Sequence, residues 1–349
     1  MANRINWGVL GNATIARKCV IPAIQKSRNG RIQALATRSP AKAREVVAEN
    51  KIPHVYDNYE ALLADSKIDA VYIPLPNHMH HPWTVRSLSA GKHVLCEKPL
   101  ACRVEEAREM AARAVETDRL LMEAFMFRFH PRSRRIKEIV DSGAIGRPCL
   151  IRAAFCYHMD ENIYQSGRNA RLKEDMGGGA LLDVGCYGVS VARWLMGAEP
   201  IKVQAQAIYH PDGVDVHVAG TLKFAEGRLA VIEASFISAL QQTYSVVGSS
   251  GALELPHDAF IPWEKDALYT QRKVDEETGR EHLIPGADEY QLMVEHFADA
   301  VSGRAQLICP AEDSIANSLV LDALSEAART GNTVTLYPGS KPANFKRQE

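Results

Sequence analysis

The sequence lacks an excess of charge of either sign and lacks any long apolar run. Across 349 residues, 41 Lys and Arg side chains stand against 42 Asp and Glu, a formal net charge of −1. Without a basic excess the chain is poorly suited to the phosphate backbone, so we expect no nucleic-acid partner. No apolar run approaches the roughly 20 residues that cross a bilayer, so we expect no membrane association. A strand-like run over 5–10 follows the N-terminus directly, so we expect no cleaved signal sequence.

Metal-binding and disulfide patterns are also missing. The seven cysteines are an odd number, and neither they nor the histidines have the spacing of metal ligands. We therefore expect reduced thiols, a cytoplasmic protein and no metal site. The hydrophobic fraction of 46% and the charged fraction of 24% are ordinary for a globular enzyme. A chain of this length is expected to form two domains.

The first part of the chain alternates strand-like and helix-like segments. This alternation predicts βαβ units and a doubly wound parallel sheet, a Rossmann domain over 1–125. Expected strands are 6–10, 31–37, 70–74, 93–97 and 120–123. The first expected helix ends near residue 27, and further helices are expected over 40–50, 81–90 and 104–117.

The pattern then changes to strands broken by glycine turns. These strands predict an α+β domain over 126–337 with an open, mostly antiparallel sheet, followed by a tail over 338–349. Expected strands are 147–157, 201–210, 216–224, 228–236 and 242–248, with helices at 288–301 and 311–329. Residues 262–282 are charged and aperiodic, and we expect a loop there.

The turn after the first strand resembles a dinucleotide-binding turn. It reads Gly11-Asn12-Ala13-Thr14-Ile15-Ala16, the G-x-G-x-x-G spacing with alanine at the second and third glycine positions. Small residues let the backbone approach a pyrophosphate, and the following helix start supplies N–H groups. A tightly packed turn without a ligand is the alternative, but the strand–turn–helix context favours a cofactor.

The end of the second strand indicates which cofactor. It reads Thr37-Arg38-Ser39, without the acid that would accept hydrogen bonds from the ribose of NAD. Arg38 can fork onto a 2′-phosphate, and the two hydroxyls can support it. A solvated arginine in a turn is the alternative. We expect NADP as the preferred cofactor, with NAD possible.

Two further segments carry candidate catalytic groups. Lys98 lies in Glu97-Lys98-Pro99 after a buried strand, and the 177–187 run places Asp183 four residues before Tyr187. Beside a nicotinium in a cleft, the pKa of Lys98 is expected to fall, and the ammonium is expected to lower the pKa of Tyr187. Three consecutive glycines, 177–179, have no obvious packing reason and suggest close approach to a ligand. A surface lysine and a capped helix with a buried tyrosine are the alternatives.

Taken together, these motifs resemble one protein family. Gly11-x-Ala13, Glu97-Lys98-Pro99, the run 123–131 and the run 177–187 are similar, in order, to the glucose–fructose oxidoreductase/inositol dehydrogenase/rhizopine catabolism (Gfo/Idh/MocA) family. The resemblance spans about residues 5–330. The Asp-Val-Gly-x-Tyr pattern that ends at Tyr187 resembles the branch with glucose–fructose oxidoreductase, D-xylose dehydrogenases and dimeric dihydrodiol dehydrogenases.

The resemblance implies a role for individual residues. Lys98 is the implied catalytic lysine, Tyr187 the proton donor or acceptor, and Asp183 their neighbour in the site. Lys98, Asp183 and Tyr187 are also implied substrate contacts, and Arg128 and His130 are expected to line the substrate pocket. Implied cofactor contacts beyond the two turns are Pro76, Asn77, His80, Glu97, Lys98 and Arg171. No arm that embraces the cofactor is expected, so NADP(H) should exchange freely.

The predicted function is NADP-dependent hydride transfer to or from a secondary alcohol or carbonyl of a sugar or cyclic polyol, with Lys98 and Tyr187 handling the proton. Alternatives are a trans-dihydrodiol or aldopyranose C1 dehydrogenase, and an NADP-binding regulatory protein without turnover. A purely structural dimerisation module is a weaker alternative. Too few helices follow the second-domain sheet to cover both faces. The resemblance implies that such an open face pairs with another subunit, so we expect a homodimer or homotetramer formed through that sheet.

Overall fold

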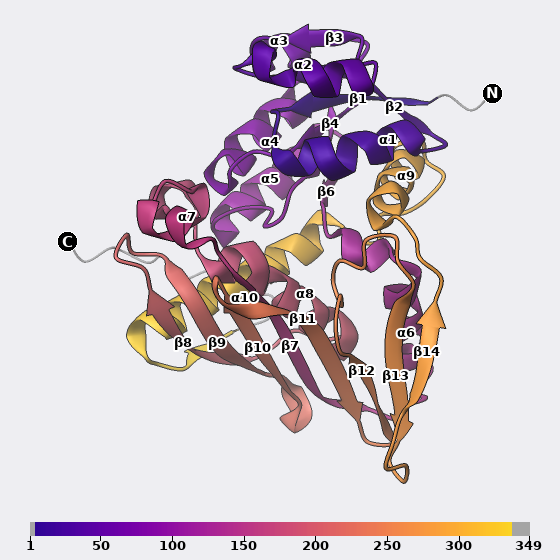
Figure 1. Ribbon diagram of the computed structural model, residues 1–349, viewed down its shortest axis with the longest axis vertical. Coiled ribbons are helices and arrows are strands. Elements are labelled where there is room, and N and C mark those ends of the chain that lie inside the picture. The colour runs from indigo at the N-terminus through magenta and orange to yellow at the C-terminus, as the bar shows by residue number, and fades with distance from the viewer. Residues whose placement is uncertain (1–3, 337–349) are drawn as a thin grey trace.

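The computed structural model describes residues 4–336 and contains two sheets with helices between and around them (Figure 1). The predicted tail over 338–349 lies outside the described residues. Among residues 4–336 no helix is both long and apolar enough to cross a bilayer.

The N-terminal sheet has six parallel strands in the order β3-β2-β1-β4-β5-β6. The order reverses between β1 and β4, and ligands of open α/β sheets bind at such a point, beyond the carboxyl ends of the strands. The strands are β1 (Ile5–Leu10), β2 (Gly30–Ala36), β3 (His54–Tyr56), β4 (Ala70–Ile73), β5 (His93–Cys96) and β6 (Leu121–Glu123). The connecting helices are η1 (Ala16–Val20), α1 (Ile21–Lys26), α2 (Pro40–Glu49), α3 (Tyr59–Leu63), η2 (Asn77–Met79), α4 (His80–Ser89) and α5 (Val104–Glu116).

The predicted fold class is confirmed, and two short elements of this sheet were not predicted. Every expected strand and helix of the Rossmann sheet is present within a few residues. Strand β3 and helix α3 are additional. They span only three and five residues, too few for a hydrophobic period to identify.

The second sheet has nine strands in the order β14-β13-β12-β11-β7-β10-β9-β8-β15, antiparallel except for the pair β7–β10. Its strands are β7 (Pro148–His158), β8 (Lys202–Tyr209), β9 (Asp215–Lys223), β10 (Leu229–Ser235), β11 (Ile237–Gly248), β12 (Gly251–Leu255), β13 (Ala267–Lys273), β14 (Arg280–Ile284) and β15 (Val334–Thr335). Its helices are η3 (Met126–Phe129), α6 (Pro131–Asp141), α7 (Glu161–Ser166), η4 (Ala170–Leu172), η5 (Glu174–Met176), η6 (Leu181–Gly185), α8 (Cys186–Met196), η7 (Ala225–Gly227), α9 (Glu289–Val301) and α10 (Ala311–Thr330).

The loop expected over 262–282 is wrong for residues 267–273 and 280–282, which are strands. Strands β13 and β14 form an antiparallel hairpin, with Ala267 opposite Ile284. This hairpin is an edge of the sheet and is partly exposed on both faces, so charged residues occupy it without a two-residue period. The strand itself is held by backbone pairing, which the side-chain pattern does not report.

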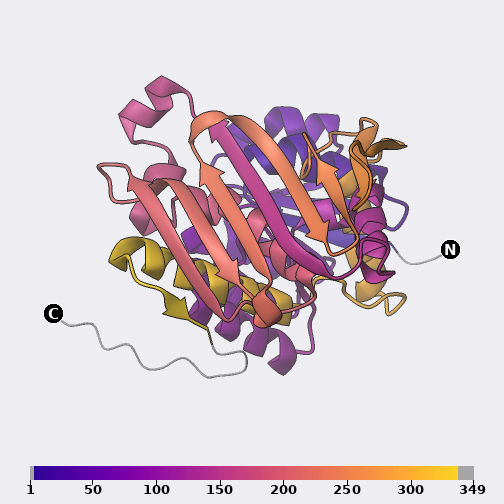
Figure 2. The same ribbon diagram turned by 90° about the horizontal axis from the view of Figure 1, so that it is seen from below.

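One face of the nine-stranded sheet packs on α8 and α10, and the other face is turned toward the viewer in Figure 2. Strand β10 shows how side-chain exposure differs between the two faces of the sheet. Ala230 and Ile232 are fully buried, whereas Leu229 and Val231, on the opposite face, are 44% and 40% exposed. Alternation of this kind is the two-residue period of a strand with one covered face.

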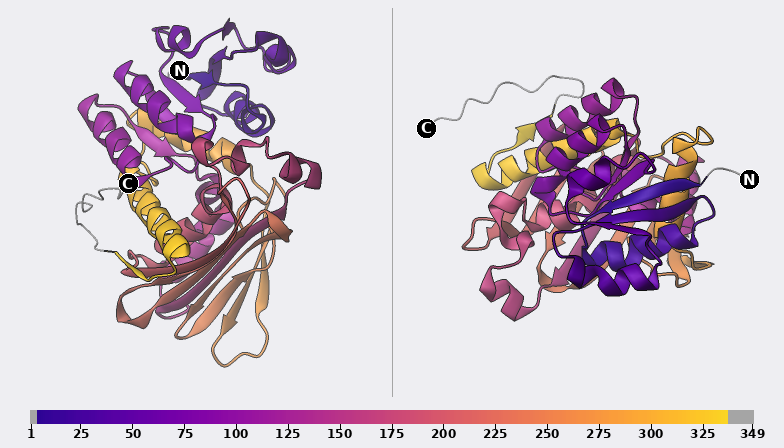
Figure 3. Two further views of the ribbon diagram at one scale, coloured as in Figure 1. Left: turned by 90° about the vertical axis from the view of Figure 1, so that its left-hand side faces the viewer. Right: turned by 90° about the horizontal axis from the view of Figure 1, so that it is seen from above.

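The last two helices return to the Rossmann half of the molecule (Figure 3). Trp7 of β1 is fully buried, with its ring centroid 5.4 Å from that of Phe297 on α9. Asp322 of α10 accepts a hydrogen bond from the Val104 amide at the start of α5, at 2.9 Å. The C-terminal helices therefore complete the core of the N-terminal domain.

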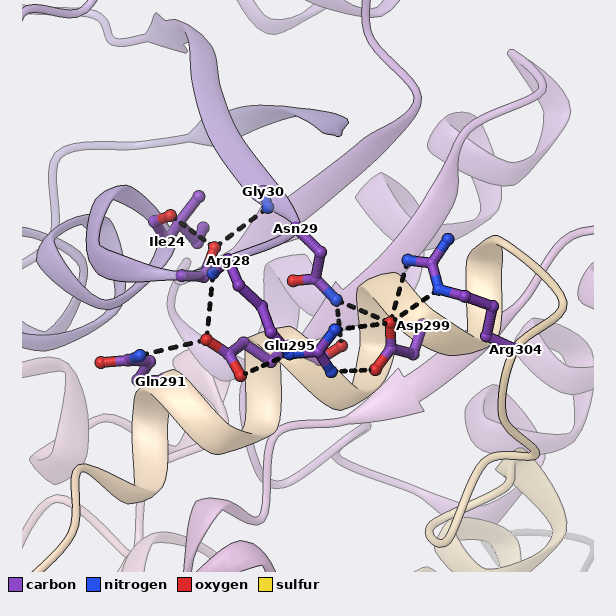
Figure 4. A network of polar contacts seen from close by, with 9 residues as sticks. Ile24, Arg28, Asn29, Gly30, Gln291, Glu295, Asp299 and Arg304 are labelled. Atoms are coloured by element: carbon purple, nitrogen blue, oxygen red, sulfur yellow. Dashed lines mark hydrogen bonds and ion pairs between the residues drawn. The ribbon is translucent and has the colours of Figure 1, made fainter. Parts of the chain in front are cut away.

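A polar network joins α9 to the turn between α1 and β2 (Figure 4). The amide of Arg28 donates to Glu295 Oε1 at 3.0 Å, and its Nε donates to Glu295 Oε2 at 3.2 Å. Asn29 Nδ2 donates to Asp299 Oδ1 at 2.8 Å, and Asp299 also pairs with Arg28 and Arg304. Burial works against the charge of Asp299, but these donors outweigh it and lower its pKa.

Candidate active site

A cavity of about 480 Å³ lies between the two sheets, beyond the carboxyl ends of the Rossmann strands. Segments that follow β1, β4 and β5 form one wall. Strand β7, the 170–187 segment, the connection between β12 and β13 and the start of α9 form the other. Of the residues predicted for the site, the cavity wall contains Ala13, Thr14, Ile15, Pro76, Asn77, Glu97, Lys98, Arg171, Asp183 and Tyr187.

The turn after β1 is shaped by its glycine. Gly11 has φ +112°, and a Cβ there would lie 2.9 Å from Leu75 Cδ2, so a larger residue would be both strained and crowded. Ala13, Thr14 and Ile15 begin the helix that runs into α1 and face the cavity. Asn12 instead donates through Nδ2 to the Lys42 carbonyl at 3.0 Å, which ties the turn to α2. The free N–H groups of a helix start therefore meet the cavity.

The residues predicted to select NADP lie at the end of β2, outside the cavity wall. Thr37 is buried, and its hydroxyl accepts a hydrogen bond from the Ser39 amide at 3.2 Å. Arg38 is exposed. Thr37 and Ser39 thus shape the turn that presents the Arg38 side chain.

The Pro76-Asn77-x-x-His80 segment divides into two parts. Asn77 Nδ2 donates to the Gly177 carbonyl at 2.8 Å, a hydrogen bond across the two walls of the cavity. His80 is fully buried, and its ring nitrogens contact the carbonyls of Pro99 and Leu75 at 2.8 and 2.7 Å. His80, predicted as a cofactor contact, is thus not among the cavity-lining residues and links the loops after β4 and β5.

The centre of the site is the carboxylate of Asp183. It accepts hydrogen bonds from Lys98 Nζ at 3.1 Å, Arg171 Nε at 2.7 Å and the Tyr157 hydroxyl at 3.1 Å. Lys98 Nζ also donates to the Asp183 carbonyl at 2.6 Å. One anion thus brings together two cations and a phenol from the two walls of the cavity.

This arrangement fixes the charge states of the network. Burial disfavours the charge of Asp183, but Lys98 and Arg171 outweigh it and hold its pKa well below the ordinary range. Burial likewise opposes the charge of Lys98 and is the largest single effect, but Asp183, Cys186 and Glu97 together outweigh it and raise the pKa of the lysine. The pKa of Lys98 is raised here because Asp183 is its nearest charged neighbour, and the lowering expected beside a bound nicotinium stays a prediction.

Tyr187 stands beside this network and is not hydrogen-bonded to it. Its hydroxyl donates to Met126 Sδ at 3.6 Å, and Lys98 Nζ lies 5.2 Å from the centroid of its ring. Burial raises the pKa of Tyr187 well above its ordinary value, with nearby anionic groups adding to the effect. The expected lowering of the Tyr187 pKa is wrong, and the phenol is neutral at any physiological pH.

Glu97 is buried behind Lys98. Its carboxylate accepts hydrogen bonds from the Tyr72 hydroxyl at 2.7 Å and from the Lys98 amide at 3.3 Å. Burial raises its pKa above the ordinary glutamate value. Glu97 therefore fixes the backbone from which the lysine projects.

The three glycines have packing reasons that the sequence does not show. A Cβ on Gly177 would lie 2.3 Å from Cys102 Sγ, one on Gly178 would lie 2.5 Å from the Arg171 carbonyl, and one on Gly179 would lie 2.4 Å from Asp215 Oδ1. Asp215 also accepts a hydrogen bond from the Leu181 amide at 2.7 Å, at the start of the helical segment that carries Asp183. The glycines line the cavity, but close packing is what requires them.

Arg128 and His130, predicted to line the substrate pocket, are not among the residues that line the cavity. Arg128 is buried, pairs with Asp313 at 2.8 Å, donates to the Ser190 hydroxyl at 2.8 Å and stacks on Trp194. His130 caps α6 by accepting a hydrogen bond from the Arg132 amide at 3.1 Å. The short helix η3 turns both side chains into the core beneath the site.

Several cavity residues were not predicted as site residues. Tyr157 lies in a correctly predicted strand, and only the strand register directs its hydroxyl to Asp183. Tyr290, at the start of the correctly predicted helix α9, also lines the cavity. Further lining side chains are Met126, Phe155, Met176, Ile261 and Trp263. Among residues 4–336 no group of three or more His, Cys, Asp or Glu side chains could hold a metal ion.

Family models match both halves of the chain. Residues 5–125 match the model described as an oxidoreductase family with an NAD-binding Rossmann fold, and residues 133–254 match the GFO/IDH/MocA C-terminal domain. Among curated proteins, D-xylose 1-dehydrogenase (NADP(+)) 2 from Haloferax volcanii is 38% identical over 331 residues, 95% of this chain and 99% of that protein. A trans-1,2-dihydrobenzene-1,2-diol dehydrogenase from Xenopus tropicalis is 31% identical over 77% of this chain and 80% of that one.

A solved structure shares the whole architecture. It is a 3-ketoreductase from Actinomadura kijaniata in complex with NADP and TDP-benzene, and it superposes with a TM-score of 0.85 at 31% identity. The alignment covers 93% of this chain and 98% of that one.

Proposed function

The chain belongs to the GFO/IDH/MocA family of oxidoreductases, and on that premise we propose that it moves a hydride between NADP and a secondary alcohol or carbonyl of a sugar or cyclic polyol. The main support for the proposal is that two features line the same cavity. A helix start suited to a dinucleotide phosphate lines the cavity, and so does a buried lysine–aspartate pair beside a neutral tyrosine.

The residues present fit NADP. Gly11 permits the tight turn, and Ala13 and Thr14 leave room for a pyrophosphate at a helix start. Arg38, exposed at the end of β2 with no acid beside it in Thr37-Arg38-Ser39, suits a 2′-phosphate. When bound, the cofactor supplies or accepts the hydride at its nicotinamide ring.

The proton chemistry falls to Lys98 and Tyr187. A carbonyl that gains a hydride at carbon must gain a proton at oxygen, and the neutral Tyr187 phenol is the group that can donate it. Its present acceptor, the thioether of Met126, is a weak one that a substrate oxygen would replace. Lys98 stays charged, so its ammonium can stabilise negative charge that develops on the oxygen.

Asp183 and Arg171 position these groups. Asp183 holds the Lys98 ammonium by two hydrogen bonds, and Arg171 holds the carboxylate from the other side. Asn77 and Pro76 line the wall from which Lys98 projects, and we expect the nicotinamide end of the cofactor to lie beside them. Groups held this way lose little freedom when substrate binds, which favours catalysis.

Turnover assays test the proposal directly. A panel of aldoses, cyclic polyols and trans-dihydrodiols, each with NADP or NADPH, would be followed at about 340 nm. Lys98→Ala and Tyr187→Phe are each expected to cut turnover at least about a hundredfold, while NADPH affinity largely survives. Tyr209→Phe, at a residue outside the cavity wall, is the matched control. Unchanged turnover in both site variants would refute the assignment.

The same panel separates the neighbouring functions. Preference for an aldose with release of the lactone would favour an aldopyranose C1 dehydrogenase, and preference for the dihydrodiol would favour that class. NADPH binding without turnover of any compound would favour a regulatory protein.

The uncovered face of the large sheet supports a homodimer or homotetramer. Leu229, Val231, Ile208 and Ile237 are exposed on strands of this sheet, and exposed apolar side chains grouped on one face are typical of subunit interfaces. Light scattering would test this, and a monomeric mass would contradict it.

We place the protein in the cytoplasm.

A further inference from the structure

A strained turn carries an exposed tryptophan to the outer edge of the cavity. The turn lies between β12 and β13, and the Lys265 amide donates to the Pro262 carbonyl across it, at 3.2 Å. Trp263 and Glu264 occupy its two central positions with φ +56° and +59°. Glycine and asparagine normally fill such positions, because other residues lose roughly 1–2 kcal/mol each in the left-handed conformation. A tryptophan here indicates that its side chain is needed.

Contacts on both sides hold this turn in place. The Gly286 amide donates to Asp266 Oδ1 at 3.0 Å, and a Cβ on Gly286 would lie 2.1 Å from the Glu264 carbonyl oxygen. On the Rossmann side, Lys26 of α1 pairs with Glu264 at 3.4 Å and with Asp288 at 3.8 Å. The surface pairs are weak, so the close approach at Gly286 is the main constraint. The backbone that carries the indole is thereby fixed relative to the cavity.

The side chain of Trp263 is poorly covered for its size. It is 53% exposed, although large aromatic side chains are usually well buried. It lines the main cavity and also a smaller one of about 100 Å³ beside α1. Burial in the fold therefore does not explain why a tryptophan occupies this position.

The inner part of the cavity has the opposite character. Lys98, Asp183, Arg171 and Tyr157 present charged and hydroxyl groups there. A ligand that fills the cavity must be polar where it meets these groups and apolar where it meets the indole. A six-membered sugar or polyol ring fits, because its hydroxyls project from the edge and its C–H groups form a flat apolar face.

We propose that Trp263 determines substrate specificity by stacking on the C–H face of a ring substrate whose hydroxyl edge reaches Lys98. This rests on the proposed function and narrows it to pyranoses and cyclic polyols over short open-chain alcohols and carbonyls. Aromatic contacts in such an arrangement add to the affinity gained by burial alone.

Three variants test the role of the indole. Trp263→Gly removes it and relieves the strained backbone, so the protein should fold and be no less stable. Trp263→Phe keeps an aromatic face. Asp118→Gly makes the same backbone relief at φ +53°, before β6 and so at the opposite end of the sheet from the cavity, and serves as the matched control.

Kinetics and fluorescence provide separate readouts. For the most active ring compound, from a set that includes D-xylose and trans-cyclohexane-1,2-diol, Trp263→Gly should raise KM roughly tenfold. Trp263→Phe should restore most of that loss, and Asp118→Gly should change nothing. KM for glyceraldehyde and Kd for NADPH should stay within about twofold in every variant. The same ring compound, with NADP present, should shield wild-type tryptophan fluorescence from acrylamide, and this shielding should vanish in Trp263→Phe.

The outcomes distinguish this proposal from the proposed function. If ring compounds shield Trp263 but no compound is turned over, the catalytic function fails and the stacking role stands. If ring compounds are turned over but do not shield Trp263, the stacking role is wrong. Equal losses for D-xylose and glyceraldehyde, or a changed Kd for NADPH, would also overturn it.

Discussion

Replacing Asp183 by asparagine tests whether one buried carboxylate organises the site. The distance from Lys98 Nζ to Asp183 Oδ1 is 3.1 Å, and the two side chains are 15% and 13% exposed. The pair Lys173–Asp212 has the same 3.1 Å separation, but its side chains are 40% and 37% exposed. The two pairs therefore differ mainly in their surroundings, and Asp212→Asn is a matched control.

The expected magnitudes follow from that difference. Unit charges 3.1 Å apart attract by about 5 kcal/mol at an effective dielectric constant near 20, and by about 1 kcal/mol in water. Desolvation of the two groups offsets part of the attraction within the buried pair, but removing the carboxylate leaves the Lys98 ammonium without its counter-charge. We expect Asp183→Asn to lower the free energy of unfolding by about 3–5 kcal/mol. Asp212→Asn should lower it by less than about 1 kcal/mol.

Urea unfolding at pH 7, followed by circular dichroism, measures both losses. The pH matters because the folded pKa of Asp183 is depressed, so its contribution is complete above the unfolded pKa and disappears as the pH falls toward the folded one. In Asp183→Asn the buried Lys98 faces Arg171 without the carboxylate, so its pKa should fall. Competitive amine labelling of Lys98 against pH would detect this. Equal stability losses in the two variants, or an unchanged Lys98 titration, would refute the reasoning.

Two further predictions concern the surroundings of the site. Burial raises the pKa of Glu123, which accepts a hydrogen bond from the Leu100 amide at 2.8 Å, to about 7. Because the pKa in the folded state exceeds the unfolded value of 4.5, the wild type loses stability as pH rises from 4.5 to 7. Glu123→Gln does not titrate, so in urea unfolding its stability should gain about 3 kcal/mol relative to wild type over that window. A stability difference that does not change with pH would contradict this. Gly177→Ala, at φ +71° and 2.3 Å from Cys102 Sγ, should lower the free energy of unfolding by at least about 1 kcal/mol, and the loss should shrink when Cys102→Gly is added; no loss in the single variant would show that the segment moves freely.

The sequence predicted those parts of the molecule that depend on neighbouring residues. The apolar run Ala70–Ile73 and the turn at Gly11 are local signals, and both lie where they were expected. Lys98, Asp183 and Tyr187 meet in the cavity because each belongs to a short motif attached to a predicted element.

What the sequence could not predict depends on long-range packing. Whether Lys98 pairs with Asp183 or with the Tyr187 hydroxyl is decided by how two distant segments meet, and that choice sets the direction of both pKa shifts. The inward turn of Arg128 depends on Asp313, 185 positions further along the chain. The hairpin β13–β14 is held by backbone pairing at an exposed edge, and its side chains carry no period.

The return of α9 and α10 to the first domain has a consequence for biosynthesis. The indole of Trp7, seven residues from the start of the chain, is covered in part by Phe297, near the end. Helices α9 and α10 are made long after the N-terminal sheet that they cover, and contacts of such separation in sequence are slow to form. The nascent Rossmann half must remain incompletely packed until residues 289–330 emerge. We conclude that the cofactor site matures only after these residues have been translated.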